Sequence, residues 1–509
     1  MADKLLIVHG YSDGRTSFTG LGEFLVQRGV YPPGNVFYLN YSSMDDEATF
    51  HDFADKLDAD YRARFNDERL DVICHSTGSL VVRAWLALHS ARAHRRGLRT
   101  EVSCPIDRLV CLAPANFGSD LARLGQSFLG KFRSTFFNKN SHEGDAGESG
   151  KIVLEGLEPA SPFQWDLSFN YDLHSPLSYF RASPKADQIC YPFVLAAGEA
   201  YTGVEARIVE PRGRLGTDGT VRIAGTSLNT RACTLDFRPD GAVIKWWDEF
   251  KFARIPFAVF AGFNHGSIID GARSDYGDPN RPGAIIEEVL RTPMTPAQYE
   301  ALAARFDAVS DWNHLRLPAD RQAKFQQFFF RVQDDVDHVL EDYHIDFYVE
   351  GPDGEPHEDL TLQFDSDFEA HITTHSTTRS YRVYLMNCTN LEAFGAELAR
   401  HNARLVLEIT GISPLPDVRY VTSRFIAYDP TAPVGEEPSL MYPNTTTLIN
   451  VALNRMQTDR LLSIDPPASS VTVKDAADLP LTGRARLVAK AAARQSDTAT
   501  PPERSSPPG

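Results

Sequence analysis

One segment limits the fold of this chain more than any other: an apolar run, a serine between small residues, and a second apolar run. The residues of 70–74 are typical of a buried strand, and apolar residues recur at helical intervals over 79–91. Between them stands His75-Ser76-Thr77-Gly78. A strand that passes so directly into a helix requires a tight turn, and this turn places Ser76 at the helix N-terminus.

Strand-like and helical segments alternate on both sides of this turn. Apolar runs predict further strands, and residues at helical spacing predict helices. Alternation of this kind predicts an α/β fold, in which helices cover both faces of a mostly parallel sheet. The expected strands are 4–8, 36–41, 108–113, 190–197 and 255–261, and the expected helices are 18–28, 48–65, 282–291, 296–309 and 319–335.

The alternation is interrupted between about residues 119 and 185, and it ends near residue 341. The first interruption is too long for a plain connection, so we expect a cap inserted into a unit that spans 1–340. Beyond it, short strand-like runs between turn residues predict an antiparallel β-sandwich over 341–490, with one helix near 391–401. One of these runs is 361–364. The Pro- and Ser-rich tail, 491–509, is expected to be disordered.

Composition narrows the classes of partner and compartment. The formal net charge of −17 argues against a nucleic-acid partner, which usually needs a basic face. The six cysteines show no CxxC spacing and are expected to be reduced and buried; no metal site or other cofactor is expected. The N-terminus has the pattern of a strand and not of a signal peptide, and no apolar run is long enough for a membrane helix. We therefore expect a cytoplasmic protein, or one secreted without a signal peptide.

Four further segments resemble the α/β-hydrolase superfamily, and within it the bacterial lipases and related acylhydrolases. They are Leu5-Leu-Ile-Val-His9-Gly10-Tyr11, Leu112-Ala-Pro-Ala-Asn-Phe-Gly-Ser119, Gly216-Thr-Asp218-Gly-Thr-Val-Arg222 and Phe263-Asn-His265-Gly-Ser267. The resemblance covers about residues 4–290, and its order of Ser, Asp and His is that of the superfamily. Cys74 departs from the family pattern, which has glycine there.

The resemblance implies a role for each of these positions. Ser76 would be the nucleophile, His265 its general base, and Asp218 the acid that orients the imidazole. The backbone N–H groups of Tyr11 and Thr77 would bind the oxyanion.

Each of these residues also has an ordinary structural interpretation. Ser76 could be a helix cap, and the Asp218-Gly pair is also a plain turn signal. Glu199 follows a strand and is the alternative acid. His75 is expected to point away from the site, and His9 to order the loop that follows the first strand.

The expected function is that of a serine hydrolase that cleaves carboxylic esters, with lipid esters as substrates, through an acyl-enzyme. A phospholipase, exported without a leader, is one alternative; a non-catalytic binding or scaffold protein on a hydrolase fold is another. In the cap, Phe128, Phe132 and Phe136 would contact acyl chains, whether the cap moves or stays packed. The C-terminal unit has three open interpretations: a module that contacts a membrane surface, a partner-binding module or a structural platform.

Overall fold

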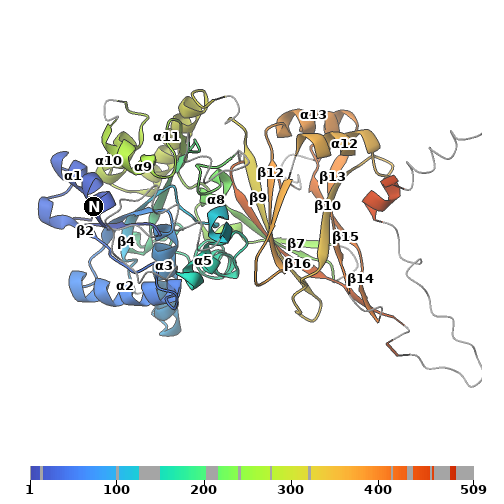
Figure 1. Ribbon diagram of the computed structural model, residues 1–509, viewed down its shortest axis with the longest axis horizontal. Helices are drawn as coiled ribbons and strands as arrows, with labels where there is room; N and C mark the ends of the chain where they lie inside the picture. The colour runs from blue at the N-terminus through green and yellow to red at the C-terminus, as the bar shows by residue number, and fades with distance from the viewer. Residues whose placement is uncertain are drawn as a thin grey trace, which may run out of the picture.

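The protein is described by a computed structural model in two units that lie side by side (Figure 1). The described residues are 2–11, 15–98, 102–124, 150–201, 216–238, 242–274, 278–318, 322–368, 370–413, 417–432, 439–458, 461–462 and 482–488.

The first unit is built on a six-stranded parallel sheet with the order β2-β1-β3-β4-β5-β8. Every neighbouring pair in it is parallel, as the alternation of strands and helices predicts. The order places β1 beside β3, and the two strands are parallel, so the segments that follow them meet at the same edge of the sheet. The strands are β1 (Leu5–Val8), β2 (Val36–Tyr38), β3 (Leu70–His75), β4 (Ile106–Leu112), β5 (Tyr191–Ala197) and β8 (Phe257–Phe260).

Helices cover both faces of this sheet because successive strand residues point to opposite sides. Leu5 and Ile7 pack in one core with α1, α9, α10 and α11, whereas Leu6 and Val8 pack in the other with α2 and α3. Figure 1 shows these two helical layers above and below the sheet. The helices are α1 (Thr19–Gln27), α2 (Phe50–Phe65), α3 (Gly78–Arg95), α9 (Ser267–Ser274), α10 (Pro282–Arg291) and α11 (Pro296–His314).

The second unit contains a six-stranded mixed sheet with the order β11-β12-β9-β16-β6-β7. Its β16 is parallel to both β9 and β6, whereas its other pairs are antiparallel, so the strands of the additional sheets are mostly antiparallel, as expected. Its strands also come from 231–246 and from 325–334, both inside the range 1–340, so no single point of the chain divides the two sheets. The strands are β6 (Arg231–Asp236), β7 (Val243–Trp246), β9 (Phe325–Asp334), β11 (Ala370–Thr374), β12 (Tyr381–Asn387) and β16 (Thr446–Leu453).

A three-stranded antiparallel sheet, β10-β13-β15, shares a core with the mixed sheet. Helices α12 (Glu358–Asp367) and α13 (Leu391–Arg400) cover one end of that core (Figure 1). The strand expected at 361–364 is wrong, because these residues lie inside α12. The strands are β10 (Tyr343–Glu350), β13 (Arg404–Gly411) and β15 (Ser423–Tyr428), and β14 (Val418–Tyr420) pairs with β17 (Arg455–Gln457).

The helix expected at 319–335 is also wrong, because this region forms strand β9. Phe328 and Phe330 face the core of the second unit, whereas Phe329 faces the core of the first. A strand buried on both faces has a continuous apolar run, and such a run does not distinguish strand from helix.

The described part of the cap lies between the two units. It consists of η3 (Asp120–Leu124), α5 (Lys151–Leu157), α6 (Pro162–Asp166) and η4 (Leu167–Asp172). Trp165 of α6 packs against Phe329 and Tyr381 of the second unit, with ring centroids 5.2 and 5.9 Å away. Phe128, Phe132 and Phe136 lie outside the described residues, as does the tail 491–509. The described residues also form the short elements η1 (Arg15–Phe18), η2 (Pro33–Asn35), η5 (Ala186–Gln188), α8 (Ile223–Thr226) and η6 (Asp248–Phe250).

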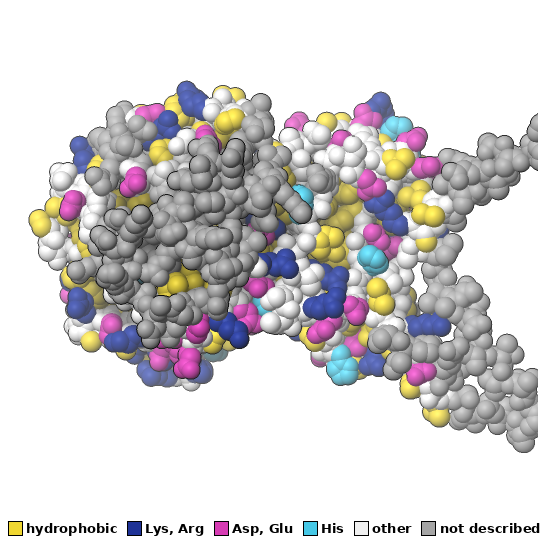
Figure 2. Space-filling model, in the orientation of Figure 1, with side chains coloured by type: hydrophobic (Ala, Val, Ile, Leu, Met, Phe, Trp, Pro, Cys, Tyr) yellow, Lys and Arg dark blue, Asp and Glu magenta, His cyan; other side chains and the backbone are white. Residues whose placement is uncertain are grey.

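The cysteines, the helices and the surface charges bear on the expectations from composition. All six cysteines are free and buried. No described helix is long and apolar enough to cross a membrane. On the face of the second unit shown in Figure 2, acidic and basic side chains are interspersed, as is typical of a solvated surface.

Candidate active site

The turn between β3 and α3 holds Ser76 in a strained conformation. Its φ of 53° lies in the left-handed region, which costs a non-glycine residue roughly 1–2 kcal/mol. Glycines make room for this turn: a Cβ at Gly10 would lie 2.9 Å from the Cβ of Ser76, and one at Gly78 would lie 2.5 Å from the carbonyl oxygen of His9. The turn therefore needs glycine at both positions, and it brings the loop after β1 against the serine.

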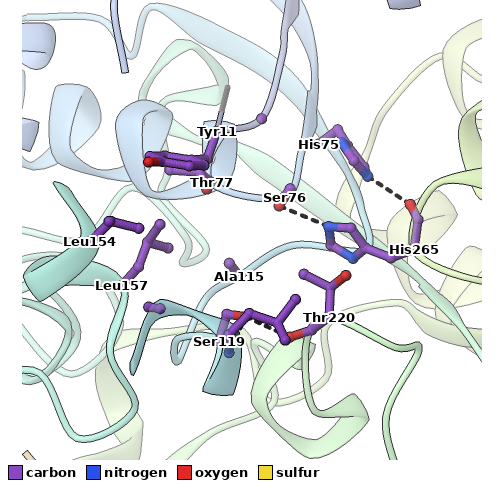
Figure 3. A pocket seen from close by; sticks show the side chains of 13 residues that line it. Tyr11, His75, Ser76, Thr77, Ala115, Ser119, Leu154, Leu157, Thr220 and His265 are labelled. Atoms are coloured by element: carbon purple, nitrogen blue, oxygen red, sulfur yellow. Dashed lines mark hydrogen bonds between the residues drawn. The ribbon is translucent and has the colours of Figure 1, made fainter. Parts of the chain in front are cut away.

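His265 lies in the loop between β8 and α9, and its ring contacts Ser76. The Nε2 atom is 2.9 Å from Ser76 Oγ (Figure 3). The Nδ1 atom is 2.8 Å from Asp218 Oδ2. In this loop Asn264 accepts hydrogen bonds from the backbone N–H groups of Gly266 and Ser267, which shape the turn around the histidine. All three side chains are buried, with exposed fractions of 8% for Ser76, 3% for His265 and 1% for Asp218.

Asp218 is held in place through its other carboxylate oxygen. Oδ1 accepts hydrogen bonds from the N–H groups of Thr220 and Val221, at 2.9 and 2.8 Å. The backbone N–H of His265 donates to the Asp218 carbonyl, which ties the two loops together. With Nδ1–H donating to the carboxylate, Nε2 of a neutral imidazole has a free lone pair for the Ser76 hydroxyl proton.

Glu199, the alternative acid, lies elsewhere. Its Oε1 accepts a hydrogen bond from the N–H of Gly262 at 2.7 Å, and its own N–H donates to Phe263. Glu199 thus supports the start of the loop that carries His265, whereas Asp218 is the acid that contacts the imidazole.

His75 lines the pocket and contacts His265, instead of pointing away from the site as expected. Its Nε2 donates to the His265 carbonyl oxygen at 2.9 Å, and the two rings are 4.8 Å apart. Burial, and next the neighbouring His265, hold the pKa of His75 well below its usual value, so the ring is neutral. In the sequence, only the position of His75 directly before Ser76 pointed to this contact with His265.

His9 orders the loop after β1, as the sequence led us to expect. His9 Nδ1 donates to the Gly10 carbonyl at 2.8 Å, and its ring stacks on Tyr41 at 4.5 Å. The Tyr41 hydroxyl in turn donates to the His9 carbonyl. This places Tyr11 beside the pocket, together with Thr77 at the start of α3 (Figure 3).

A mostly apolar pocket of about 540 Å³, including its open mouth, lies over Ser76. The cap side of the pocket is lined by Leu154 and Leu157 of α5 and by Leu121 and Ala122 of η3, and these two elements adjoin each other where the Ser119 N–H donates to the Leu157 carbonyl. Sequence patterns did not single these residues out; the only signal was the spacing of the two leucines on one helical face. The remaining lining residues are Gly10, Tyr11, His75, Thr77, Ala115, Ser119, Thr220 and His265. Among the residues that the structure describes, no group of His, Cys, Asp or Glu side chains could hold a metal ion.

The described cap is fixed to α3 by a buried ion pair. Arg83 Nε is 2.6 Å from Asp172 Oδ2, and both side chains are almost fully buried. Arg83 also donates to Ser168 Oγ and to the Asn116 carbonyl. Because separating such a pair would leave a buried charge without a partner, this part of the cap is a packed element of the fold.

The parallel sheet, together with the serine turn and the histidine loop, is typical of the α/β-hydrolase fold. The chain has that fold. Along most of its length it is similar to the phospholipase PlaB from Legionella pneumophila, with a TM-score of 0.73 and 22% identity over 93% of this chain and 98% of that one. The same phospholipase in complex with thio-NAD gives a TM-score of 0.70 and 21% identity, over 92% and 98%. Because the similarity extends through the second unit, both units form one recurring architecture. No family model matches the sequence, and no curated protein matches it.

Proposed function

We propose that this protein is a serine hydrolase that cleaves carboxylic esters of lipids. The hydrogen-bonded series Ser76–His265–Asp218, which opens into an apolar pocket, carries this proposal. The similarity in fold to a phospholipase supports lipid esters as the substrate class.

In the proposed reaction His265 Nε2 takes the Ser76 hydroxyl proton while Oγ bonds to the ester carbonyl carbon. The backbone N–H groups of Tyr11 and Thr77 would bind the resulting oxyanion, each donor contributing about 3–4 kcal/mol. As the tetrahedral intermediate collapses, the bond to the alcohol oxygen breaks and His265 gives its proton to that oxygen. A water molecule, deprotonated by His265, then attacks the acyl-enzyme, which releases the fatty acid and restores Ser76.

Labelling with a fluorophosphonate tests the nucleophile. We expect wild type to be labelled at Ser76 and to hydrolyse p-nitrophenyl esters, and Ser76→Ala to lose both properties. Ser90→Ala is a matched control, because Ser90 lies on the same helix and bonds to the Leu177 carbonyl away from the site. An unlabelled wild type, or full activity in Ser76→Ala, would contradict the proposal and favour a non-catalytic scaffold.

Substrate assays decide between a lipase and a phospholipase. Both use the same acyl chemistry, so triacylglycerol and glycerophospholipid should be compared side by side on one preparation. Preferred hydrolysis of short soluble esters, with neither lipid cleaved, would remove lipids as the substrate class.

A further inference from the structure

A hairpin of the second unit bonds directly to the α5 region beside the pocket over Ser76, and it is linked to η3 through Arg222. The hairpin joins β11 to β12, and residues 375–380 form its loop. It belongs to the unit for which the sequence left three interpretations open, and it supplies no residue to the pocket lining.

On the α5 side, the loop bonds to residues that directly neighbour the lining leucines. Thr377 Oγ1 donates to Glu155 Oε1 at 2.7 Å, and the Ser376 N–H donates to Glu158 Oε2 at 3.1 Å. Glu155 follows Leu154, and Glu158 follows Leu157. A shift of either glutamate would therefore move the leucine beside it.

His375 shapes this loop from within. Its ring is buried, and Nδ1 accepts a hydrogen bond from the Thr378 N–H at 3.2 Å. The proton of a neutral ring is then on Nε2, which lies 3.4 Å from the Glu155 carbonyl oxygen and 3.9 Å from Glu158 Oε2. The loop thus faces α5 with three donors that meet three oxygens.

Strand β11 is linked to η3 through Arg222. Thr373 Oγ1 accepts a hydrogen bond from Arg222 Nη2 at 3.1 Å. Arg222 also donates to both carboxylate oxygens of Asp120, at 2.9 and 2.8 Å. Asp120 directly precedes Leu121 of the lining, and Arg222 lies two residues after Thr220. Although β11 is an edge strand with an exposed start, Thr373 is buried at this contact.

We propose that the β11–β12 hairpin fixes the positions of α5 and η3 and thereby determines which acyl chains the enzyme accepts. The inference rests on the proposed function, since it assigns substrate selectivity to that same site. Thr373 and Thr377 act as positioning residues, because Thr377 bonds to the neighbour of a lining leucine and Thr373 reaches η3 only through Arg222. Small changes matter in such a pocket: one methylene changes discrimination by about 10- to 200-fold.

The test is the double variant Thr373→Val/Thr377→Val, which keeps side-chain shape and removes both hydroxyls. The ratio of kcat/KM for p-nitrophenyl laurate to that for p-nitrophenyl butyrate is expected to change by about fivefold or more, mainly through KM of the laurate. Thr378→Val, in the same loop, should leave the ratio within about twofold of wild type. A double variant that is folded and labelled at Ser76 like wild type, yet has an unchanged ratio, would overturn the inference. An unlabelled wild type would instead overturn the proposed function.

A variant on the α5 side keeps the test decisive if the double variant does not fold. Glu155→Ala removes the acceptor for Thr377 at a partly exposed position, so the fold should be retained. We expect it to change the ratio in the direction that Thr377→Val does, and the two substitutions combined should change it no further than either alone. Additive effects would show that the two residues act independently and would contradict the contact as the cause.

Discussion

The parallel sheet and the mixed sheet differ in which parts of the chain supply their strands. All strands of the parallel sheet lie between residues 5 and 260, and the loops that follow β1, β3 and β8 bring Tyr11, Ser76 and His265 together. The mixed sheet collects strands from 231–246, 325–387 and 446–453. It contributes none of the three hydrogen-bonded residues, but its edge supports the pocket. The proposed chemistry and the proposed support of the pocket thus involve different sheets, and substitutions in the two should have different consequences.

If the loops of the parallel sheet carry the chemistry, Asp218→Asn should have a large effect on activity. An amide at this position favours the wrong imidazole tautomer, and kcat should fall by about 10³- to 10⁴-fold. Steady-state hydrolysis of a soluble ester measures this. Glu199→Gln is the matched control and should lose less than about tenfold, since Glu199 contacts the Gly262 backbone instead of the ring. Similar losses in both variants would contradict the assignment of the acid.

The buried ion pair between Arg83 and Asp172 is expected to hold the described cap against the unit with the parallel sheet. Arg83→Met leaves the buried Asp172 carboxylate without its partner and should lower the free energy of unfolding by about 3–5 kcal/mol. Burial already raises the pKa of Asp172, and Arg83 opposes that rise. Denaturant unfolding measures the change, and Arg83→Met/Asp172→Leu should recover most of it. Lys56→Met removes an exposed ion pair and should change the free energy of unfolding little. An equally small decrease for Arg83→Met would indicate that the described cap detaches easily.

The junction of the two units can be weakened at Phe329. This side chain is fully buried and contacts Trp165 of the cap and Phe117 of the first unit. Phe329→Ala should cost about 3–4 kcal/mol, whereas Ile372→Ala, at an exposed position of the same sheet, should cost little. Calorimetry should show one cooperative transition at a lower Tm. Two separate transitions in wild type would mean that the sheets are independent.

A smaller effect is expected from pH at His174, another contact between the units. Its ring bonds to the Trp247 carbonyl and to Thr230 Oγ1, and burial lowers its pKa to about 3. Because the folded pKa is below the unfolded value, this histidine stabilises the fold above about pH 6.5, and that stability is lost as pH falls. At pH 5 the loss is about 2 kcal/mol. Urea unfolding at pH 7 and pH 5 should show a smaller decrease for His174→Gln than for wild type; equal decreases would contradict burial as the cause.

The sequence predicted the first sheet well because its strands and helices are local patterns. The turn at Ser76 and the loops with Asp218 and His265 are also local, and the structure brings these three residues together. The second sheet was harder to predict. Which strands pair with β16 depends on partners far along the chain, and the run of phenylalanines in β9 has no periodicity that separates strand from helix. For the same reason, no local sequence pattern indicated that Thr373 would bond to Arg222 and Thr377 to Glu155 beside the pocket.

The pairing of β6 with β16 has a consequence for synthesis of the protein. Arg231 lies opposite Thr447, so β6 leaves the ribosome long before its partner does. Until residue 453 emerges, β6 presents an open edge and Phe329 lacks a finished sheet around it. The nascent chain therefore has an aggregation-prone interval, and shortened versions that end before β16 should require chaperones or precipitate.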